Sequence, residues 1–206
     1  MGVISNGTTL LDAGALDSGI ATGDMILIKT LTASSSANLT FHNGASDVVF
    51  DGTYKEYVFR FLDIHAQTDG AFFSFQANAA GASGFNETVT SAAFEAYHAE
   101  DDGSAALGYS AGSDKAQATT FINLNCGAHD ADNDSCSVGS LRIFDPANTT
   151  FVKHFIAETN NKINGSETDN SFFAGYFNTT TAIDEIQFKF NSGNIDSGQI
   201  KLYGIK

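Results

Sequence analysis

The segment TYKEYVFRFLDIHAQTDGAFFSFQA, residues 53–77, decides the fold class of this chain. Its first half is dense in aromatic and branched residues, which favour β-strands. Because side chains alternate along a strand, the pattern predicts one face with Tyr57, Phe59 and Phe61 and another with Val58, Arg60, Leu62 and Ile64. The turn residues QTDG and the apolar run after them predict a hairpin with a return strand at 71–77.

The same pattern of short apolar runs and turn residues continues over the rest of the chain. It predicts further strands at 25–31, 37–41, 118–125, 137–145, 150–157, 172–177, 182–190 and 197–205. Ile186, Phe188 and Phe190 alternate with polar residues, as in an antiparallel sheet with one wet side. The segment GNIDSGQ predicts a hairpin between the last two strands. Residues 90–102 fit a short helix or a strand equally well.

Roughly ten strands and little helical signal predict an all-β fold, an antiparallel β-sandwich of jelly-roll type. Residues 25–206 are expected to form this single domain. Residues 1–24 are rich in Gly, Ser, Thr and Asp and predict an irregular N-terminal arm for attachment or oligomer contact.

Composition excludes several classes of partner. Ten Lys and Arg stand against 24 Asp and Glu, a formal net charge of −14, so phosphate backbones repel the chain and we expect no nucleic-acid binding. A polybasic run and an apolar stretch of about 20 residues are both lacking, so we expect no membrane partner. The N-terminus does not resemble a secretory signal, which predicts synthesis in a cytoplasm.

The segment CGAHDADNDSC between the two cysteines is the most site-like stretch. Asp130, Asp132 and Asp134 alternate as the first ligands of an EF-hand calcium loop do. The match ends there, because Ser135 stands where glycine is needed and Leu141 where glutamate is needed. A calcium site of another type and a solvated acidic loop tip are both open, and we expect no other cofactor.

Cys126 and Cys136 flank this loop. They could close a disulfide across its base, whereas assembly in a reducing cytoplasm favours free thiols. A zinc site with His129 lacks a fourth ligand and the usual spacings.

Catalytic motifs are scarce. The chain contains no G-x-S-x-G nucleophile elbow and no phosphate-binding glycine loop. Glu95 and Glu100 could form a carboxylate pair for glycoside hydrolysis. We expect a protein without catalytic residues, with a small hydrolase as a remaining alternative.

Three segments together resemble virion structural proteins of marine cyanophages and related ocean tailed phages. They are residues 53–76 with their T-D-G turn, LRIFDPANTTFVKHF (141–155), and AIDEIQFKFNSGNIDSGQIKLYGIK (182–206) with its LYGI ending. The resemblance spans about residues 25–206.

The resemblance implies a jelly-roll module on the outer surface of a virion, as a capsid decoration or a tail or fibre component. Its expected partners are other virion proteins of capsid or tail, and synthesis is expected in the host cytoplasm. Phage fibres and decorations are often trimers, so by analogy we expect a homo-oligomer, a trimer.

The alternative is a carbohydrate-binding adhesin that recognises a glycan of the host surface. Sugar sites favour exposed aromatic platforms, and the chain has no Trp. The candidate glycan contacts are therefore Tyr97, Tyr109 and Tyr176, which lie near expected loops.

Overall fold

The computed structural model describes residues 3–5, 8–12, 15–16, 24–163 and 166–206. Every regular element in these ranges is a β-strand, and all strand pairs are antiparallel. Within the predicted arm, β1 (Val3–Ser5), β2 (Thr8–Asp12) and β3 (Ala15–Leu16) pair as a small sheet. The rest of this arm, and the attachment expected of it, lie outside the described residues.

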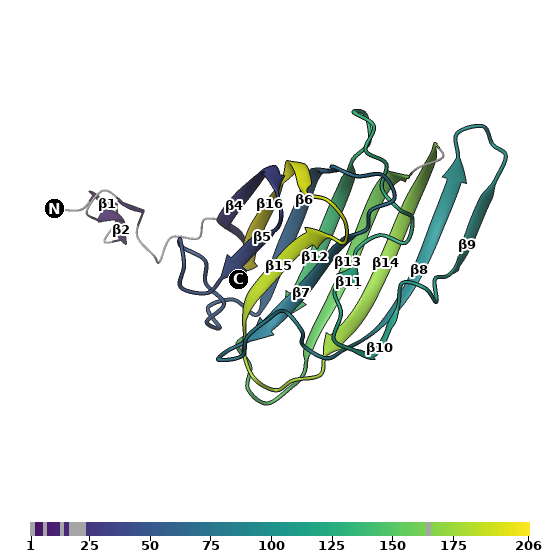
Figure 1. Cartoon of the computed structure of the whole chain (residues 1–206). Helices are drawn as coiled ribbons and strands as arrows, with labels where there is room; N and C mark the ends of the chain where they lie inside the picture. The colour runs from purple at the N-terminus through teal and green to yellow at the C-terminus, as the bar shows by residue number, and fades with distance from the viewer. Residues whose placement is uncertain (1–2, 6–7, 13–14, 17–23, 164–165) are drawn as a thin grey trace.

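Two further sheets make the main body, with the small sheet in front of part of the large one (Figure 1). The large sheet has the order β10-β8-β14-β13-β12-β6-β16-β4, and β9 also pairs with β8. Its strands are β4 (Met25–Ser36), β6 (Glu56–Ala66), β8 (Val89–Ala99), β9 (Ala105–Tyr109), β10 (Lys115–Ala118), β12 (Ser137–Phe144), β13 (Lys153–Ile163), β14 (Glu167–Phe177) and β16 (Ile195–Ile205). The small sheet has the order β11-β7-β15-β5, with β5 (Leu39–His42), β7 (Phe73–Ala79), β11 (Ile122–Asn123) and β15 (Ile183–Phe190).

Eight of these strands form a complete jelly roll. In chain order these eight strands are β4, β5, β6, β7, β11, β12, β15 and β16. The large sheet contains, as successive neighbours, the first, eighth, third and sixth of them: β4, β16, β6 and β12. In the small sheet, β5, β15, β7 and β11 are the second, seventh, fourth and fifth. This interleaving of two sheets is the jelly-roll order, so the predicted fold class is confirmed.

The other strands of the large sheet are insertions into this jelly roll. The first insertion, β8 to β10, falls between β7 and β11, and the second, β13 and β14, falls between β12 and β15. Both extend the large sheet on the side of β12, where β8 and β9 reach past the small sheet (Figure 1). We call these inserted strands, β8, β9, β10, β13 and β14, the wing. The segment 90–102, which fitted a helix or a strand, is mostly strand β8.

Both predicted hairpins are wrong. β6 and β7 lie in different sheets, and so do β15 and β16. Gly70 and Gly193 do make tight turns with positive φ, of 73° and 69°. These turns carry the chain across the sandwich, because turn chemistry fixes a change of direction and not the sheet that the next strand joins.

The predicted face of Ile64 is also wrong. It was expected beside Val58 and Arg60, but it is fully buried in the core. Asp63, with φ 51°, interrupts the alternation of β6, and the pairing with β16 shifts register nearby. A β-bulge of this kind moves every later side chain to the opposite face. Gly198 faces the bulge, where a Cβ would come within 2.5 Å of the Asp63 carbonyl oxygen.

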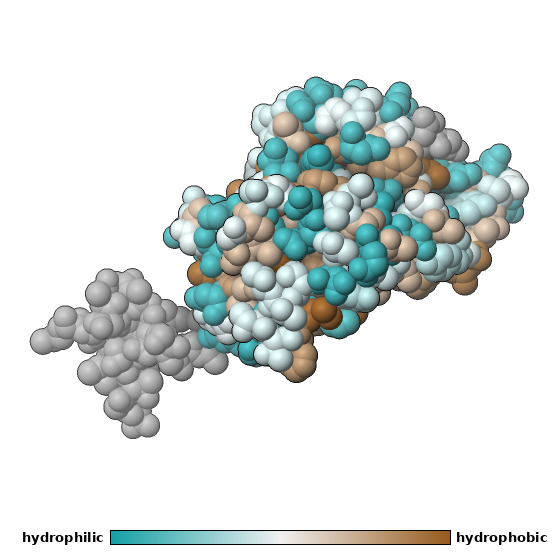
Figure 2. Space-filling view, turned by 60° about the horizontal axis from the view of Figure 1, so that its bottom comes forward, coloured by the Kyte–Doolittle hydropathy of each residue, from teal (hydrophilic) through white to brown (hydrophobic). Residues whose placement is uncertain are grey.

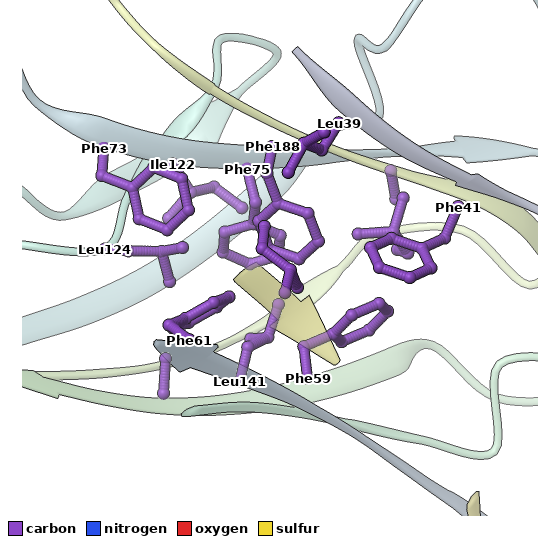
Figure 3. Close-up of a cluster of buried hydrophobic side chains, with 14 of the residues drawn as sticks. Leu39, Phe41, Phe59, Phe61, Phe73, Phe75, Ile122, Leu124, Leu141 and Phe188 are labelled. Carbon is purple, nitrogen blue, oxygen red and sulfur yellow. The ribbon is translucent and has the colours of Figure 1, made fainter. Parts of the chain in front are cut away.

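Phenylalanine rings from both sheets fill the core (Figure 3). Phe188 of β15 lies at the centre, with its ring 5.1 Å from Phe59 and 5.4 Å from Phe61, both on the opposite sheet. It also lies 6.0 Å from Phe73 and 6.3 Å from Phe75. Edge-to-face and offset contacts of this kind are the favoured geometries for aromatic rings.

Replacing the central ring should weaken the sandwich strongly. We expect Phe188→Ala to lower the free energy of unfolding by about 3–5 kcal/mol, because it leaves a cavity between the sheets. Phe151→Ala is the control, since this side chain is 69% exposed and its loss should change stability by less than about 0.5 kcal/mol. Urea unfolding of both variants measures the difference, and equal losses would contradict the central place given to Phe188.

Candidate binding surface

The inner face of the wing changes from apolar to polar along its strands. The buried residues of β13 run from Phe155 and Ala157 to Thr159 and Asn161. The polar end is covered by the loop after β11 instead of the small sheet, and buried loop backbone needs hydrogen-bond partners. The wing supplies four of these partners. The Thr159 hydroxyl donates to the Leu124 carbonyl, and the Asn161 side-chain amide donates to the Gly127 carbonyl. The Asp169 carboxylate accepts from the Gly127 amide, and the Ser171 hydroxyl accepts from the Cys126 amide.

Ser137 and His129 lie in this polar region with the geometry of a nucleophile and a base. The Ser137 Oγ lies 2.7 Å from the His129 Nε2. Both residues are buried, however, and no atom of the described chain bonds the His129 Nδ1. A substrate carbonyl cannot reach the serine in this conformation, so the pair serves the packing of the loop.

The three predicted calcium ligands do not converge on one point. Asp130 Oδ1 accepts the Asp132 amide at 2.9 Å, which closes a local turn. The Lys162 ammonium lies 3.7 Å from Asp130 Oδ2 and 3.6 Å from Asp134 Oδ1 and acts as their counter-ion. Within the described ranges, no three His, Cys, Asp or Glu side chains are grouped to hold a metal. Calcium binding by this loop stays a prediction, and it would have to displace Lys162.

Both cysteines are free thiols in the structure. Cys126 lies near Ser110, Ser171 and Glu95, and burial raises the pKa of its thiol. Cys136 lies near Asp63, and burial raises the pKa of this thiol as well. Neither is an activated thiolate, because a reactive cysteine needs a lowered pKa. The disulfide between them stays a prediction.

The outer face of the wing, which points away from the small sheet, is largely apolar. The side chains on this face alternate with buried ones, and strand register places them side by side. Phe172 and Phe94 stack with their ring centres 4.7 Å apart, and Tyr109 follows in the same row on β9. We call this surface the wing face; its residues are Phe94, Leu107, Tyr109, Ile156, Phe172 and Tyr176.

Four of these side chains are strongly exposed, and Phe172 and Tyr176 are half-buried. Leu107 is 75% exposed, Tyr109 61%, Ile156 51% and Phe94 45%. The side of the molecule in Figure 2, by contrast, has hydrophobic residues in small groups among polar ones. A contiguous apolar patch on a folded domain is typical of an interaction surface.

A shallow hollow of about 560 Å³ continues the wing face toward the turn after β12. Phe144, His154, Ile156 and Tyr176 line it, with the Tyr176 and His154 rings 5.8 Å apart. Polar groups border the other side of the face, where Asn170 Nδ2 donates to Glu158 at 3.2 Å beside the Phe172 ring. Aromatic rings edged by amide and carboxylate groups are the usual elements of a ligand site.

The structure brings two of the three predicted glycan contacts to this face. Tyr109 and Tyr176 both point outward, and the Tyr109 hydroxyl donates to Asp114 Oδ2 at 2.5 Å. Tyr97 is opposite Ala106 and Asp169 in register, on the inner side of the large sheet. It therefore lies on the other surface from the first two.

Sequence reasoning missed the phenylalanine and aliphatic residues of the wing face. Their signal is a pair of adjacent apolar residues in a strand, as in Phe155-Ile156 and Phe172-Phe173. One member of each pair must point away from the core. Such pairs mark a strand with two apolar faces, although they do not say which face stays exposed.

No protein-family model, curated protein or solved structure matches this chain. The described residues include no helix that is long and apolar enough to cross a membrane.

His129 should make the fold sensitive to acid. Burial, and secondarily the neighbouring His65, lowers its pKa to about 3 from 6.5. Between pH 6.5 and pH 3 the unfolded chain therefore binds a proton at His129 that the native state does not bind. The free energy of unfolding is unaffected by protonation of this residue above pH 6.5 and falls as the pH drops toward 3. The loss is on the order of 4 kcal/mol.

This slope is measurable by urea unfolding between pH 7 and pH 4. We expect His129→Gln to flatten it, whereas His154→Gln, at an exposed position, should leave it unchanged. An identical slope in all three proteins would mean that other groups control acid unfolding.

Proposed function

We propose that this chain is a non-enzymatic structural protein of a marine tailed bacteriophage, carried on the outer surface of the virion. It would act as a capsid decoration or as a component of tail or fibre, with other virion proteins as partners and as a homo-oligomer. The observation that carries the proposal is the wing face, an apolar surface on inserted strands that do not belong to the eight strands of the jelly roll. Such a surface suits assembly, where many weak contacts add up to high avidity.

Two further observations support this function. The three segments that resemble marine phage virion proteins correspond to β6 and β7, to β12 with the start of β13, and to β15 and β16. Apart from the start of β13, all of these strands belong to the eight of the jelly roll. The net charge of −14 also suits a protein present at high local density, because charge repulsion between copies opposes aggregation.

The test is the copy number of this protein in purified virions, measured by quantitative mass spectrometry against the major capsid protein. We expect the protein to be present. A copy number near that of the capsid protein would indicate a head decoration, and a much lower one would indicate tail or fibre. Absence from virions would overturn the proposal.

The second candidate function is that of an adhesin for a host-surface glycan. The stacked rings of Phe94 and Phe172, with Asn170 and Glu158 beside them, favour it, because sugars pack on aromatic faces and bond to amide and carboxylate groups.

A glycan array with the purified chain tests this second function. We expect Phe94→Ala to reduce glycan binding at least about tenfold, a loss of roughly 1.4 kcal/mol. Leu62→Ala is the control, since Leu62 is exposed on the jelly-roll part of the large sheet. The absence of any glycan signal, or equal binding by both variants, would exclude this face as a sugar site.

A further inference from the structure

β9 is an edge strand without the usual protection. Its five residues, Ala105 to Tyr109, are all exposed, and it pairs with no strand but β8 in the described part of the chain. It has no charged residue, no proline and no irregularity in its register with β8. Soluble proteins generally block such edges, because the free backbone groups invite another strand.

Two hydrogen bonds fix which backbone groups are free. The Ser110 amide donates to the Ala93 carbonyl, and the Ala99 amide donates to the Ser104 carbonyl, both at 2.9 Å. In an antiparallel ladder, alternate residues direct both backbone groups to the same neighbour. The even-numbered residues of β9 therefore bond β8, and Ala105, Leu107 and Tyr109 direct their N–H and C=O groups to the open edge.

We propose that β9 pairs antiparallel with β9 of a second copy of this chain, around a two-fold axis at Leu107. The two large sheets then become one continuous sheet with both wing faces on the same side. This pairing rests on the homo-oligomer of the proposed function and gives it as a dimer, but its test needs only the purified chain, so its failure is distinguishable from absence of the protein from virions.

The register of this pairing follows from the free groups. With Leu107 opposite Leu107 of the second copy, Ala105 of each chain lies opposite Tyr109 of the other. All three residues direct their backbone groups to the edge, so each facing pair can exchange both hydrogen bonds. The side chains also fit, since a large residue faces a small one and the two leucines meet on the axis.

Apolar surface is also lost to water in this pairing. Leu107, at 75%, is the most exposed large hydrophobic residue of the described chain, and it would be covered by its counterpart. Tyr109 and Phe94 then continue the apolar row across the junction. A two-fold contact of this type closes on itself and leaves no free copy of the edge.

Charge opposes the pairing at its two ends. Asp101 and Asp102 precede β9, and Asp114 follows it with Lys115 next in sequence, so the ends that antiparallel pairing brings together carry more acidic than basic groups. Salt weakens this repulsion, because the screening length falls from ~8 Å at physiological ionic strength to ~3 Å at 1 M. The dimer should therefore tighten as sodium chloride is raised.

Sedimentation equilibrium of the full chain tests the pairing. We expect a monomer–dimer equilibrium whose dissociation constant falls with added salt and rises about tenfold or more in Leu107→Glu, which places two carboxylates on the axis. Val138→Glu is the matched control, since Val138 is 43% exposed on the outer face of β12 and far from the edge in strand order, and its dissociation constant should stay unchanged.

Amide hydrogen exchange, followed by NMR, gives a second measurement on the unmodified chain. The amides of Ala106 and Gly108 should exchange slowly at every protein concentration, because they bond β8. Those of Ala105, Leu107 and Tyr109 should exchange fast in dilute protein and slowly when it is concentrated. A monomer at all concentrations, a trimer, or a dimer in which these three amides still exchange fast would overturn the proposal.

Discussion

The contact of Phe188 with Phe59 and Phe61 joins the two sheets, and the rest of the structure depends on it. Sheets in a sandwich pack about 10 Å apart, a gap that facing phenyl rings can fill in edge-to-face contact. Phenylalanine suits this place because it has no polar atom to satisfy. Tyr57 shows what a polar atom costs at such a place. Its buried hydroxyl has no hydrogen-bond partner among the described residues, and burial raises the pKa of this side chain to about 12.

The wing follows from what this core leaves uncovered. The small sheet is too narrow to face all strands of the large sheet, so β13 and β14 are covered partly by phenyl rings and partly by a loop. The buried side chains change with the cover, from Phe155 to Asn161 along a single strand. At the other end of β13, the buried Lys153 ammonium donates to the carbonyl of Phe151, which likewise satisfies loop backbone. Polar burial in this protein is thus a consequence of loops packed on a sheet.

Most strand positions were predictable from the sequence, and their arrangement was only partly so. β9 and β10 were missed, and apart from the last residue of β10 the predicted strand at 118–125 contains only the two residues of β11. The period of two in the last strands placed Ile186, Phe188 and Phe190 correctly in the core. The bulge at Asp63 depends on a long-range contact with Gly198, and no local pattern announces it. For the same reason turns could not be assigned to hairpins or to crossings between sheets. The candidate surface was found only through Tyr109 and Tyr176, because the exposure of its other residues depends on which strands the small sheet covers.

An uncharged strand edge beside an apolar face favours aggregation of a free protein. The negative charge of the rest of the chain opposes this aggregation. With a net charge of −14, copies repel each other in every orientation that lacks compensating contacts. Growth into filaments requires two different complementary edges. The opposite edge strand, β4, carries Lys29 and is much longer than β9, so it offers no equivalent match. In the proposed pairing, the acidic surface would limit association to the one orientation in which backbone hydrogen bonds and apolar contacts form together, at β9 and the wing face.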